Sequence, residues 1–295
     1  MGKKFDDYKH SKVKFLGFEY DTKPFLITMA TAVGVLGVLV ILSICGVGIS
    51  WYGVMFGMGF IVALALGTQT FPVRGLNKDY PYTLIWWVFP CAIIGARAYF
   101  LMFDGVDQSF IDWFKIWEGG LAIYGGVIGG AIGLVLSSLV HNQHIFKTTD
   151  AVAPLLSIGQ AFGRIGCIFG NCCYGVEVTN KALRWFPIAI KVNGDYHFAT
   201  NLYEAVLDFV LFIILNKLLR KVDIVGVNTC AYLVGYGIVR FILEFFRAEE
   251  QTLMIGSMAV SQLVSVACVM VGVIGICVLL FVNNRKEKVE EKGKM

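Results

Sequence analysis

Eight stretches of about 20 mostly apolar residues limit what this chain of 295 residues can fold into. A helix needs about 20 apolar residues to cross the hydrocarbon core of a bilayer, and it satisfies its own backbone hydrogen bonds there. The composition agrees, since 57% of the residues are apolar, 16% are charged and the mean hydropathy is +0.70. We therefore predict an all-α, polytopic bundle of eight transmembrane helices. The predicted spans are 25–45, 50–70, 83–103, 120–140, 151–170, 202–219, 227–246 and 257–281.

The basic residues predict how this bundle is oriented. If both termini are cytoplasmic, 17 of the 25 Lys and Arg residues fall on the inner side, five on the outer side and three within spans. Cytoplasmic loops of membrane proteins carry such an excess of positive charge. The net charge of +4 is therefore a topology signal, and we expect no nucleic-acid partner.

The same pattern predicts the organisation of the chain. Residues 1–49 form a basic cytoplasmic leader and an extra N-terminal helix, which we expect to be retained as an anchor. Residues 50–282 form the main membrane domain, and 171–200 form an outer loop that acts as a lid over the site. Residues 283–295 form a charged cytoplasmic tail.

Arginines within the spans are the first candidate functional residues. Arg97, Arg164 and Arg240 all fall toward the outer ends of their spans. A charged side chain in the bilayer costs about 2.5–3.5 kcal/mol or more and therefore marks a partner or a function. Arg240 has Glu244 one helical turn away, a spacing that suits an ion pair. Arg97 and Arg164 have no counter-charge nearby in the sequence, so we expect an anionic ligand to be their partner.

That ligand is expected to carry a phosphate. A guanidinium presents a planar fork of donors that matches phosphate oxygens, so several arginines at one interface suit a phospholipid headgroup. Arg247, at the end of its span, either joins this cluster or extends to the membrane surface.

Two glycine-rich segments interrupt the spans. Gly126, Gly130 and Gly133 are predicted to allow close helix packing, whereas the chain around Tyr124 permits an irregular backbone. The run 163–175 is expected to break the helix near membrane depth. It contains Cys172 and Cys173, which fit a metal-site fragment, a redox pair or simple packing. We predict no metal site, because no nearby His–Cys set completes a zinc site.

Six short motifs occur in an order that resembles the prolipoprotein diacylglyceryl transferase family, over residues 50–282. They are Trp51-Tyr52-Gly53, Gly95-Ala96-Arg97, the run from Gly119 to Gly126, Gly163-Arg164-Ile165-Gly166, Leu202-Tyr203-Glu204 and the run from Tyr236 to Arg247.

The resemblance implies an enzyme of the bacterial plasma membrane with its active site near the extracytoplasmic face. Such an enzyme transfers the diacylglyceryl group of phosphatidylglycerol to the lipobox cysteine thiol of a secreted prolipoprotein, and glycerol phosphate is released. It implies no cofactor and a monomer among membrane lipids, whose protein partners are prolipoprotein signal peptides.

The resemblance also implies roles for individual residues. Arg164 and Arg240 hold the phosphate, Glu244 orients Arg240 or takes a proton, and Tyr52 and Tyr236 line the lipid site. The implied catalytic residues are Tyr124, Arg164, Arg240 and Glu244. The implied substrate-binding residues are Tyr52, Arg97, Asn171, Glu204, Tyr236 and Arg247.

The chain departs from the family pattern at several positions. Tyr124 stands where many members have His, Cys167 where many have Asn, and Ala199 where a Pro is expected. Gly170-Asn171-Cys172 replaces a more polar set. A related enzyme with a different acceptor therefore stays open, as do an anion or lipid transporter and a non-catalytic lipid-binding protein.

Overall fold

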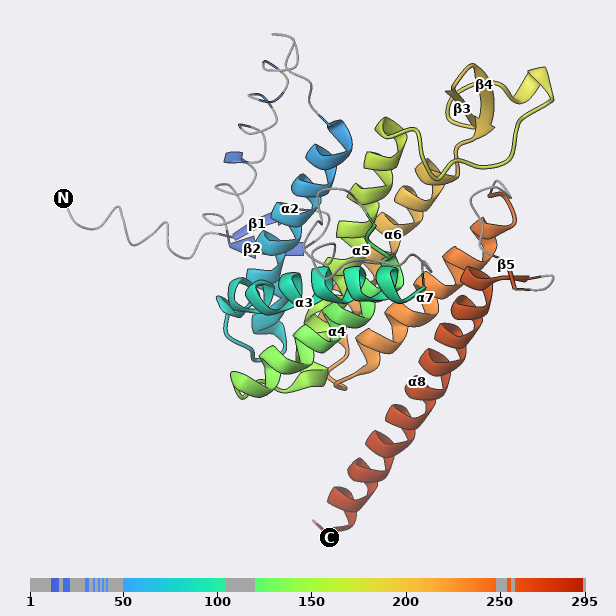
Figure 1. The fold of residues 1–295 in the computed structure, drawn as a ribbon. Helices are drawn as coiled ribbons and strands as arrows, with labels where there is room; N and C mark the ends of the chain where they lie inside the picture. Colours follow the sequence, from blue (N-terminus) through green and yellow to red (C-terminus); the bar gives the residue numbers. More distant parts are fainter. Residues whose placement is uncertain are drawn as a thin grey trace. The chain divides into compact units, whose positions relative to one another are not determined.

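A computed structural model describes residues 12–15, 18–21, 50–103, 120–247, 254–255 and 258–293, with isolated positions between 30 and 41 (Figure 1). Within these residues the chain is mostly helical, which confirms the all-α class. The first predicted span, 25–45, lies largely outside the described residues. The other seven predicted spans coincide with helices, whose bounds differ from the predicted ones by at most a few residues except in α5 and α8.

The helices and strands follow one another in a simple order. The described elements are β1 (Lys12–Phe15), β2 (Phe18–Asp21), α2 (Trp51–Val73), α3 (Tyr80–Phe103), α4 (Ile123–Val140), α5 (Ile145–Phe169), η4 (Lys181–Leu183), β3 (Ala189–Val192), β4 (Asp195–Phe198), α6 (Thr200–Lys221), α7 (Val227–Glu244), β5 (Met254–Ile255), β6 (Met258–Ala259) and α8 (Val260–Gly293). The strands form three two-stranded antiparallel pairs: β1 with β2, β3 with β4 and β5 with β6.

Five helices of the described residues are long and apolar enough to cross a membrane, namely α2, α3, α4, α5 and α8. Large apolar side chains such as Trp86, Met102 and Ile123 are exposed on them, as expected for surfaces that face lipid. Helices α6 and α7 are more polar. The buried residues of α6 recur every three or four positions and include Asn201, Glu204 and Asp208, so its polar face points into the protein.

Helix α5 differs from the prediction that the run 163–175 breaks the helix. The helix continues to Phe169 and leaves helical geometry at Asn171 and Cys173, whose φ angles are +48° and +58°. Of the glycines here, Gly166 serves close packing, whereas Gly163 has open space around it. A Cβ at Gly166 would lie 3.2 Å from the Tyr52 carbonyl of α2. The prediction is therefore right that the run ends the helix and wrong for the first seven residues of the run, which are helical.

Helix α8 is also longer than its predicted span, which ends at residue 281. It runs to Gly293, so most of the predicted charged tail is helical.

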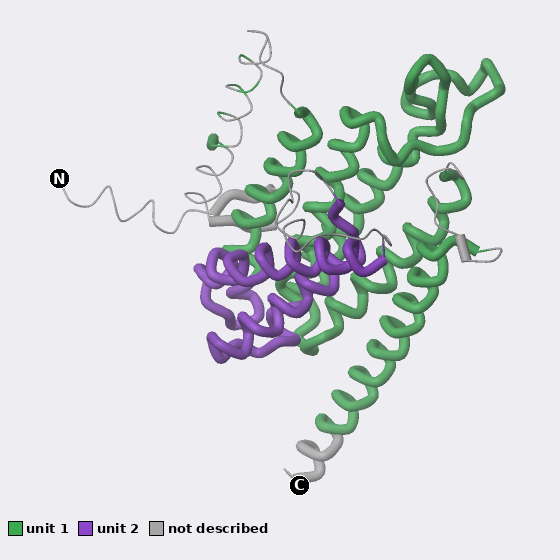
Figure 2. The backbone as a smooth tube through the Cα atoms, viewed as in Figure 1, with its two compact units in different colours: residues 1–70, 150–295 green, residues 71–149 purple. Residues whose placement is uncertain are grey.

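The chain divides into two compact units, residues 71–149 and the rest (Figure 2). Inside the unit 71–149, α4 packs on α3 through Gly125, Gly129 and Gly133, which are all buried. A Cβ at Gly133 would lie 2.7 Å from the Trp87 carbonyl. The prediction of close helix packing is confirmed for Gly133. It is wrong for Gly126 and Gly130, which have room for a methyl group. Tyr124 is helical, but residues 120–122 just before α4 are not, and Gly120 has a φ of +73°, which agrees with the irregular backbone expected before the helix.

In the larger unit, glycines also bring α7 and α8 together. A Cβ at Gly237 would lie 2.9 Å from the Ser265 carbonyl, and one at Gly272 would lie 2.7 Å from the Cys230 carbonyl. The earlier residue of α7, Cys230, meets the later residue of α8, Gly272, so the two helices are antiparallel. Gly237 lies three residues before Arg240, so this packing supports the segment of α7 that carries the arginine.

A buried aspartate joins α5 to the start of α7. Asp150 accepts hydrogen bonds from the Gly226 N–H at 2.8 Å, from the Thr229 N–H at 2.9 Å and from the Thr229 hydroxyl at 2.8 Å. The carboxylate therefore satisfies N–H groups at the N-terminus of α7, where the helix dipole favours negative charge. Arg164 and Arg240 each follow this anchor by fourteen residues (150 to 164, 226 to 240), about 21 Å along a helix. The two arginines thus lie at the same distance along their helices from the anchor.

The α3–α4 contact is tested by adding one methyl group at two adjacent glycines. Gly129→Ala places a Cβ against the Cys91 backbone and should destabilise the protein by about 1–3 kcal/mol. Gly130→Ala is the control, because its Cβ would meet Val88 only at 3.7 Å and alanine favours the helix. Thermal unfolding in detergent measures both. Equal melting temperatures for the two variants would show that α3 and α4 do not pack as described.

The Asp150 anchor is tested by Asp150→Ala. Two N–H groups at the start of α7 lose their acceptor, so we expect a loss of about 2–4 kcal/mol in unfolding free energy. Asp223→Ala is the control. Asp223 is exposed in the connection between α6 and α7, so its removal should change stability by less than about 0.5 kcal/mol. Denaturation in detergent gives both values, and a neutral Asp150→Ala would rule out the anchor.

Candidate functional site

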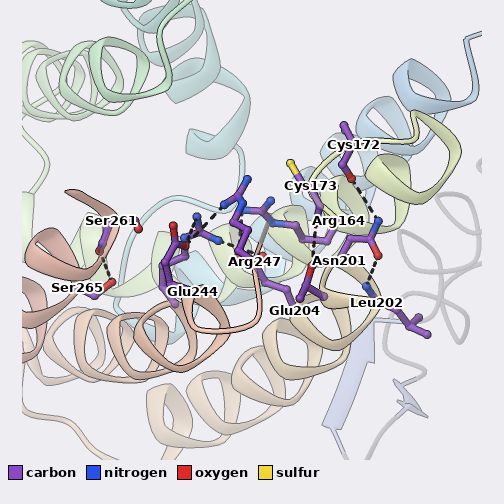
Figure 3. A network of polar contacts seen from close by, with 12 residues as sticks. Arg164, Cys172, Cys173, Asn201, Leu202, Glu204, Glu244, Arg247, Ser261 and Ser265 are labelled. Atoms are coloured by element: carbon purple, nitrogen blue, oxygen red, sulfur yellow. Dashed lines mark hydrogen bonds and ion pairs between the residues drawn. The ribbon is translucent and has the colours of Figure 1, made fainter. Parts of the chain in front are cut away.

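Charged side chains from α5, α6 and α7 meet in one continuous network (Figure 3). Arg164 Nη2 lies 2.9 Å from Glu204 Oε1, and Arg240 Nη1 lies 3.4 Å from Glu204 Oε2. Arg240 Nη2 lies 2.9 Å from Glu244 Oε2, which is 3.8 Å from Arg247 Nη1. We call these five residues the arginine–glutamate chain. Two carboxylates link three guanidiniums, which come from α5, from α7 and from the turn directly after α7.

The arginine–glutamate chain has a formal surplus of one positive charge. Its carboxylates are the more deeply buried members, with 3–4% of each side chain exposed, whereas 14–17% of each guanidinium side chain is exposed. The glutamates therefore support the arginines from within, and the guanidiniums reach accessible space. Each guanidinium has five N–H donors, and Arg164 engages Glu204 through one terminal nitrogen. The geometry suits a bound anion with several oxygens.

The sequence predictions for these arginines are partly confirmed. The Arg240–Glu244 pair at i and i+4 is present. The expectation that Arg164 lacks a protein counter-charge is wrong, because Glu204 of α6 supplies one. Sequence neighbours reveal partners on the same helix only, and Glu204 lies 40 positions away. Arg247 contacts Glu244 and so joins the cluster, the first of the two possibilities that the sequence left open for this arginine.

Two predicted tyrosines lie around the arginine–glutamate chain. Tyr236 precedes Arg240 by one turn of α7 and is stacked on Tyr232, with ring centroids 5.8 Å apart. It is close enough to Arg164, Glu204 and Arg240 to interact with them electrostatically. Tyr52 of α2 interacts in the same way with Arg164.

Asn171 has a structural role in addition to any role in binding. It is exposed and adopts a φ of +48° in the turn that ends α5. Asn tolerates this left-handed geometry better than most residues. Its predicted contact with substrate stays a prediction.

Arg97 and Tyr124 belong to the other compact unit. Arg97 is buried, donates a hydrogen bond from Nη1 to the Gly120 carbonyl at 3.0 Å and lies over the Phe100 ring. The ring of Tyr124 lies 6.3 Å from that of Tyr99. Within this unit Arg97 thus has neutral partners in the protein itself, and its predicted anionic ligand stays a prediction. The roles of both residues in a site stay predictions.

The segment between α5 and α6 is fastened beside Arg247. Strands β3 and β4 form a hairpin, and the Val176 N–H donates to the Phe246 carbonyl at 3.0 Å. The Phe198 ring is stacked on that of Phe246, with centroids 5.5 Å apart. The predicted lid segment is thus attached to the end of α7 that carries the arginine–glutamate chain.

Three cysteines gather at the end of α5. The sulfur atoms of Cys167, Cys172 and Cys173 all lie within 4.8 Å of one another. The hydrogen bond with the Cys167 thiol, together with Arg164 and Arg247, lowers the pKa of Cys173 well below its usual range, against the opposing effect of burial. Burial raises the pKa of Cys172. Sequence reasoning treated Cys172 and Cys173 as a pair and missed Cys167 as the third member.

Asp208 is a second residue that sequence reasoning missed. It lies one turn after Glu204 on α6, is completely buried, and its carboxylate oxygens have no hydrogen-bond partner among the described residues. The signal was available, because Glu204 and Asp208 stand four positions apart in an apolar segment and so share one helical face.

Comparison with known proteins gives one consistent family. Residues 39–278 match the family model described as prolipoprotein diacylglyceryl transferase. A phosphatidylglycerol–prolipoprotein diacylglyceryl transferase of Clostridium kluyveri is 35% identical over 254 residues, which cover 84% of this chain and 98% of the relative. The protein named phosphatidylglycerol–prolipoprotein diacylglyceryl transferase 1 of Clostridium perfringens is 33% identical over 253 residues, which cover 83% of this chain and 96% of the relative. One of Clostridium botulinum strain Hall is 35% identical over 224 residues, covering 74% and 87%.

Glu204→Gln tests the central link of the arginine–glutamate chain. The substitution keeps the shape of the side chain and removes the charge that balances Arg164 and Arg240, so we expect a loss of about 3 kcal/mol in stability. The exposed Glu287→Gln on α8 serves as the control and should have little effect. Unfolding in detergent measures both.

The double variant Glu204→Gln/Arg164→Gln shows whether this loss comes from the ion pair. It should lose less stability than the sum of the two single losses, because each single variant already breaks the same pair. Strict additivity would contradict a direct interaction between Glu204 and Arg164.

Proposed function

The chain belongs to the prolipoprotein diacylglyceryl transferase family, and on that basis we propose that it transfers the diacylglyceryl group of phosphatidylglycerol to the lipobox cysteine thiol of prolipoproteins. The chain covers nearly the full length of the relatives that carry this name. The observation that supports the reaction most directly is the arginine–glutamate chain, in which Arg164 and Arg240 share Glu204. The protein is therefore a transferase that acts in the first step of lipoprotein maturation.

The arginine pair meets the main electrostatic demand of this reaction. As the thiol sulfur bonds to the glyceryl carbon, the bond from that carbon to the phosphate oxygen breaks, and negative charge builds up on the departing glycerol phosphate. Fixed cationic donors in a site of low polarity stabilise such charge without reorganising. Arg164 and Arg240 are held in advance by Glu204 and Glu244, so they are already in place for the phosphate.

The remaining residues complete the proposed site. Glu244 orients Arg240, and Arg247 extends the positive field toward the segment that follows α5. Tyr236, beside Arg240, and Tyr52, beside Arg164, line the glyceryl part of the lipid. Asn171 is a proposed contributor to the same site, and the family resemblance implies substrate binding by Arg97 and a catalytic role for Tyr124.

We propose that the site lies near the extracytoplasmic face of a bacterial plasma membrane. The distribution of Lys and Arg supports cytoplasmic termini, which puts the ends of α5 and α7 that carry Arg164 and Arg240 on the outer side. Phosphatidylglycerol then enters sideways from the outer leaflet, and the predicted lid segment 171–200 covers the headgroup. The protein is proposed to act as a monomer.

Arg164→Ala and Arg240→Ala test the proposed reaction. Each removes a cation from the departing phosphate and should lower kcat at least about 100-fold, the usual cost of one stabilising donor in such a site. The assay uses the purified protein, phosphatidylglycerol and a lipobox peptide, and it measures glycerol phosphate and the lipidated peptide. Arg285→Ala, exposed near the end of α8, should retain full activity.

The products separate the alternatives. Lipidated peptide together with an equal amount of glycerol phosphate supports the proposal. Glycerol phosphate formed without peptide modification points to a different acceptor. If the wild-type protein forms neither product, it is not a transferase of this type, and full activity in Arg240→Ala removes that residue from the site.

A further inference from the structure

The three cysteines at the end of α5 form a preorganised group. Cys167 lies in the last turn of the helix, and Cys172 and Cys173 lie in the turn that follows. The Cys172 N–H donates to the Cys167 carbonyl at 3.1 Å, which folds the chain back on the helix. All three sulfur atoms lie within 4.8 Å of one another. The fold thus gathers three thiols that are up to six positions apart in the sequence.

Buried hydrogen bonds from α6 hold this turn in place. The Thr200 hydroxyl donates to the Cys173 carbonyl at 3.0 Å, and Asn201 Nδ2 donates to the Cys172 carbonyl at 3.3 Å (Figure 3). Asn201 is completely buried. Cys173 adopts a φ of +58°, a left-handed conformation that is costly for a non-glycine residue. The hydrogen bonds from α6 hold Cys173 in this conformation, in which its sulfur lies near those of Cys167 and Cys172.

The spacing of the sulfurs fits a thiophilic metal ion. Tetrahedral zinc binds cysteine sulfur at about 2.3 Å, which puts neighbouring sulfurs about 3.8 Å apart. The three sulfurs, all within 4.8 Å of one another, lie near this spacing. A divalent ion with three thiolates has a net charge of −1, and Arg164 and Arg247 provide positive charge at this position. Three protein ligands also leave the fourth position open, as in catalytic zinc sites.

The open position would lie beside the site of the reaction. Arg164 is close enough to Cys167 and Cys173 to interact with them electrostatically, and it also binds Glu204 in the arginine–glutamate chain. A free thiol has a pKa near 8.5 and must lose its proton before it attacks carbon. Glu204 and Glu244 are both engaged by guanidiniums. A metal ion offers another means of activation, because it deprotonates a thiol that coordinates it.

We infer that Cys167, Cys172 and Cys173 bind zinc(II) and that this ion takes the acceptor cysteine of the prolipoprotein as its fourth ligand. The inference rests on the proposed transferase function for the role of the ion, but not for its binding. This inference takes up the metal-site reading of Cys172 and Cys173 in place of the sequence prediction of no metal site, because Cys167 adds a third sulfur to the pair.

The chemical step balances without an oxidant or reductant. On coordination the acceptor thiol releases its proton to water. The thiolate sulfur then forms a bond to the glyceryl carbon, the bond from that carbon to the phosphate oxygen breaks, and its electron pair leaves with glycerol phosphate beside Arg164 and Arg240. The resulting thioether is a weaker ligand than a thiolate, so the lipidated product leaves and zinc(II) is unchanged.

Metal content tests the site independently of activity. The full-length protein is purified in detergent without oxidant, stripped with a chelator and reloaded with zinc(II). We expect about one zinc per chain for the wild type, and close to none for Cys167→Ser, Cys172→Ser and Cys173→Ser. Cys268→Ser, on α8, is the matched control and should keep its zinc. Cys172→His restores a suitable ligand and should keep zinc even if Cys172→Ser folds poorly.

Cobalt(II) reports whether the acceptor thiol becomes the fourth ligand. The cobalt-loaded wild type should show a sulfur-to-cobalt charge-transfer band, which grows when a lipobox peptide is added and does not change with the same peptide carrying Ser in place of Cys. Identical spectra with the two peptides would overturn the role in binding the acceptor. A disulfide between two of the three cysteines in this protein, or zinc content unaffected by all three substitutions, would overturn the metal site.

Turnover separates this inference from the proposed function. Stripped protein should transfer slowly at pH 7, recover with zinc(II), and gain activity without zinc as the pH rises past about 8.5, where the free thiol ionises. Full activity of stripped protein and of Cys172→Ala at pH 7 would overturn the zinc mechanism and leave the transferase function intact. Stoichiometric zinc binding without any lipid transfer would instead overturn the proposed function and the role of the ion in it.

Discussion

The contact between Glu204 and two arginines is the interaction on which the proposed site depends. Two guanidiniums repel each other, and each is costly to remove from water. A buried carboxylate between them allows Arg164 of α5 and Arg240 of α7 to lie close together. Glu244 repeats this arrangement between Arg240 and Arg247. The protein can thus keep three cations ready for a phosphate and still fold.

The sequence predicted those features of the fold and the site that depend on residues close together in the chain. Apolar runs predicted the positions of α2 to α8, because a membrane helix needs length and apolarity and little else. The Arg240–Glu244 pair was also predictable, since both residues lie on one helix. The partner of Arg164 was not, because Glu204 comes from another helix. The glycine set of α4 was misassigned for a similar reason, because Gly129 and Gly130 differ only in what α3 places opposite them.

Family motifs and geometry supply different parts of the functional argument. The order of the motifs and the match over residues 39–278 identify the family, and the geometry shows which predicted residues meet. The cysteines were visible in the sequence only as departures from the family pattern. Their common position beside Arg164 became apparent from the turn that ends α5, which no local pattern predicts. Cys167, a departure from the family pattern, therefore lies near Arg164, which belongs to one of the family motifs.

The anchor at Asp150 also restricts how this chain can change over time. From that point α5 and α7 extend over the same number of residues to Arg164 and Arg240. Inserting one residue into either stretch would turn its guanidinium by about 100° and move it by ~1.5 Å. The other helix would then need a matching insertion to bring both charges back to Glu204. The two stretches are thus tied to a common length, although each is free to vary in sequence where it faces lipid.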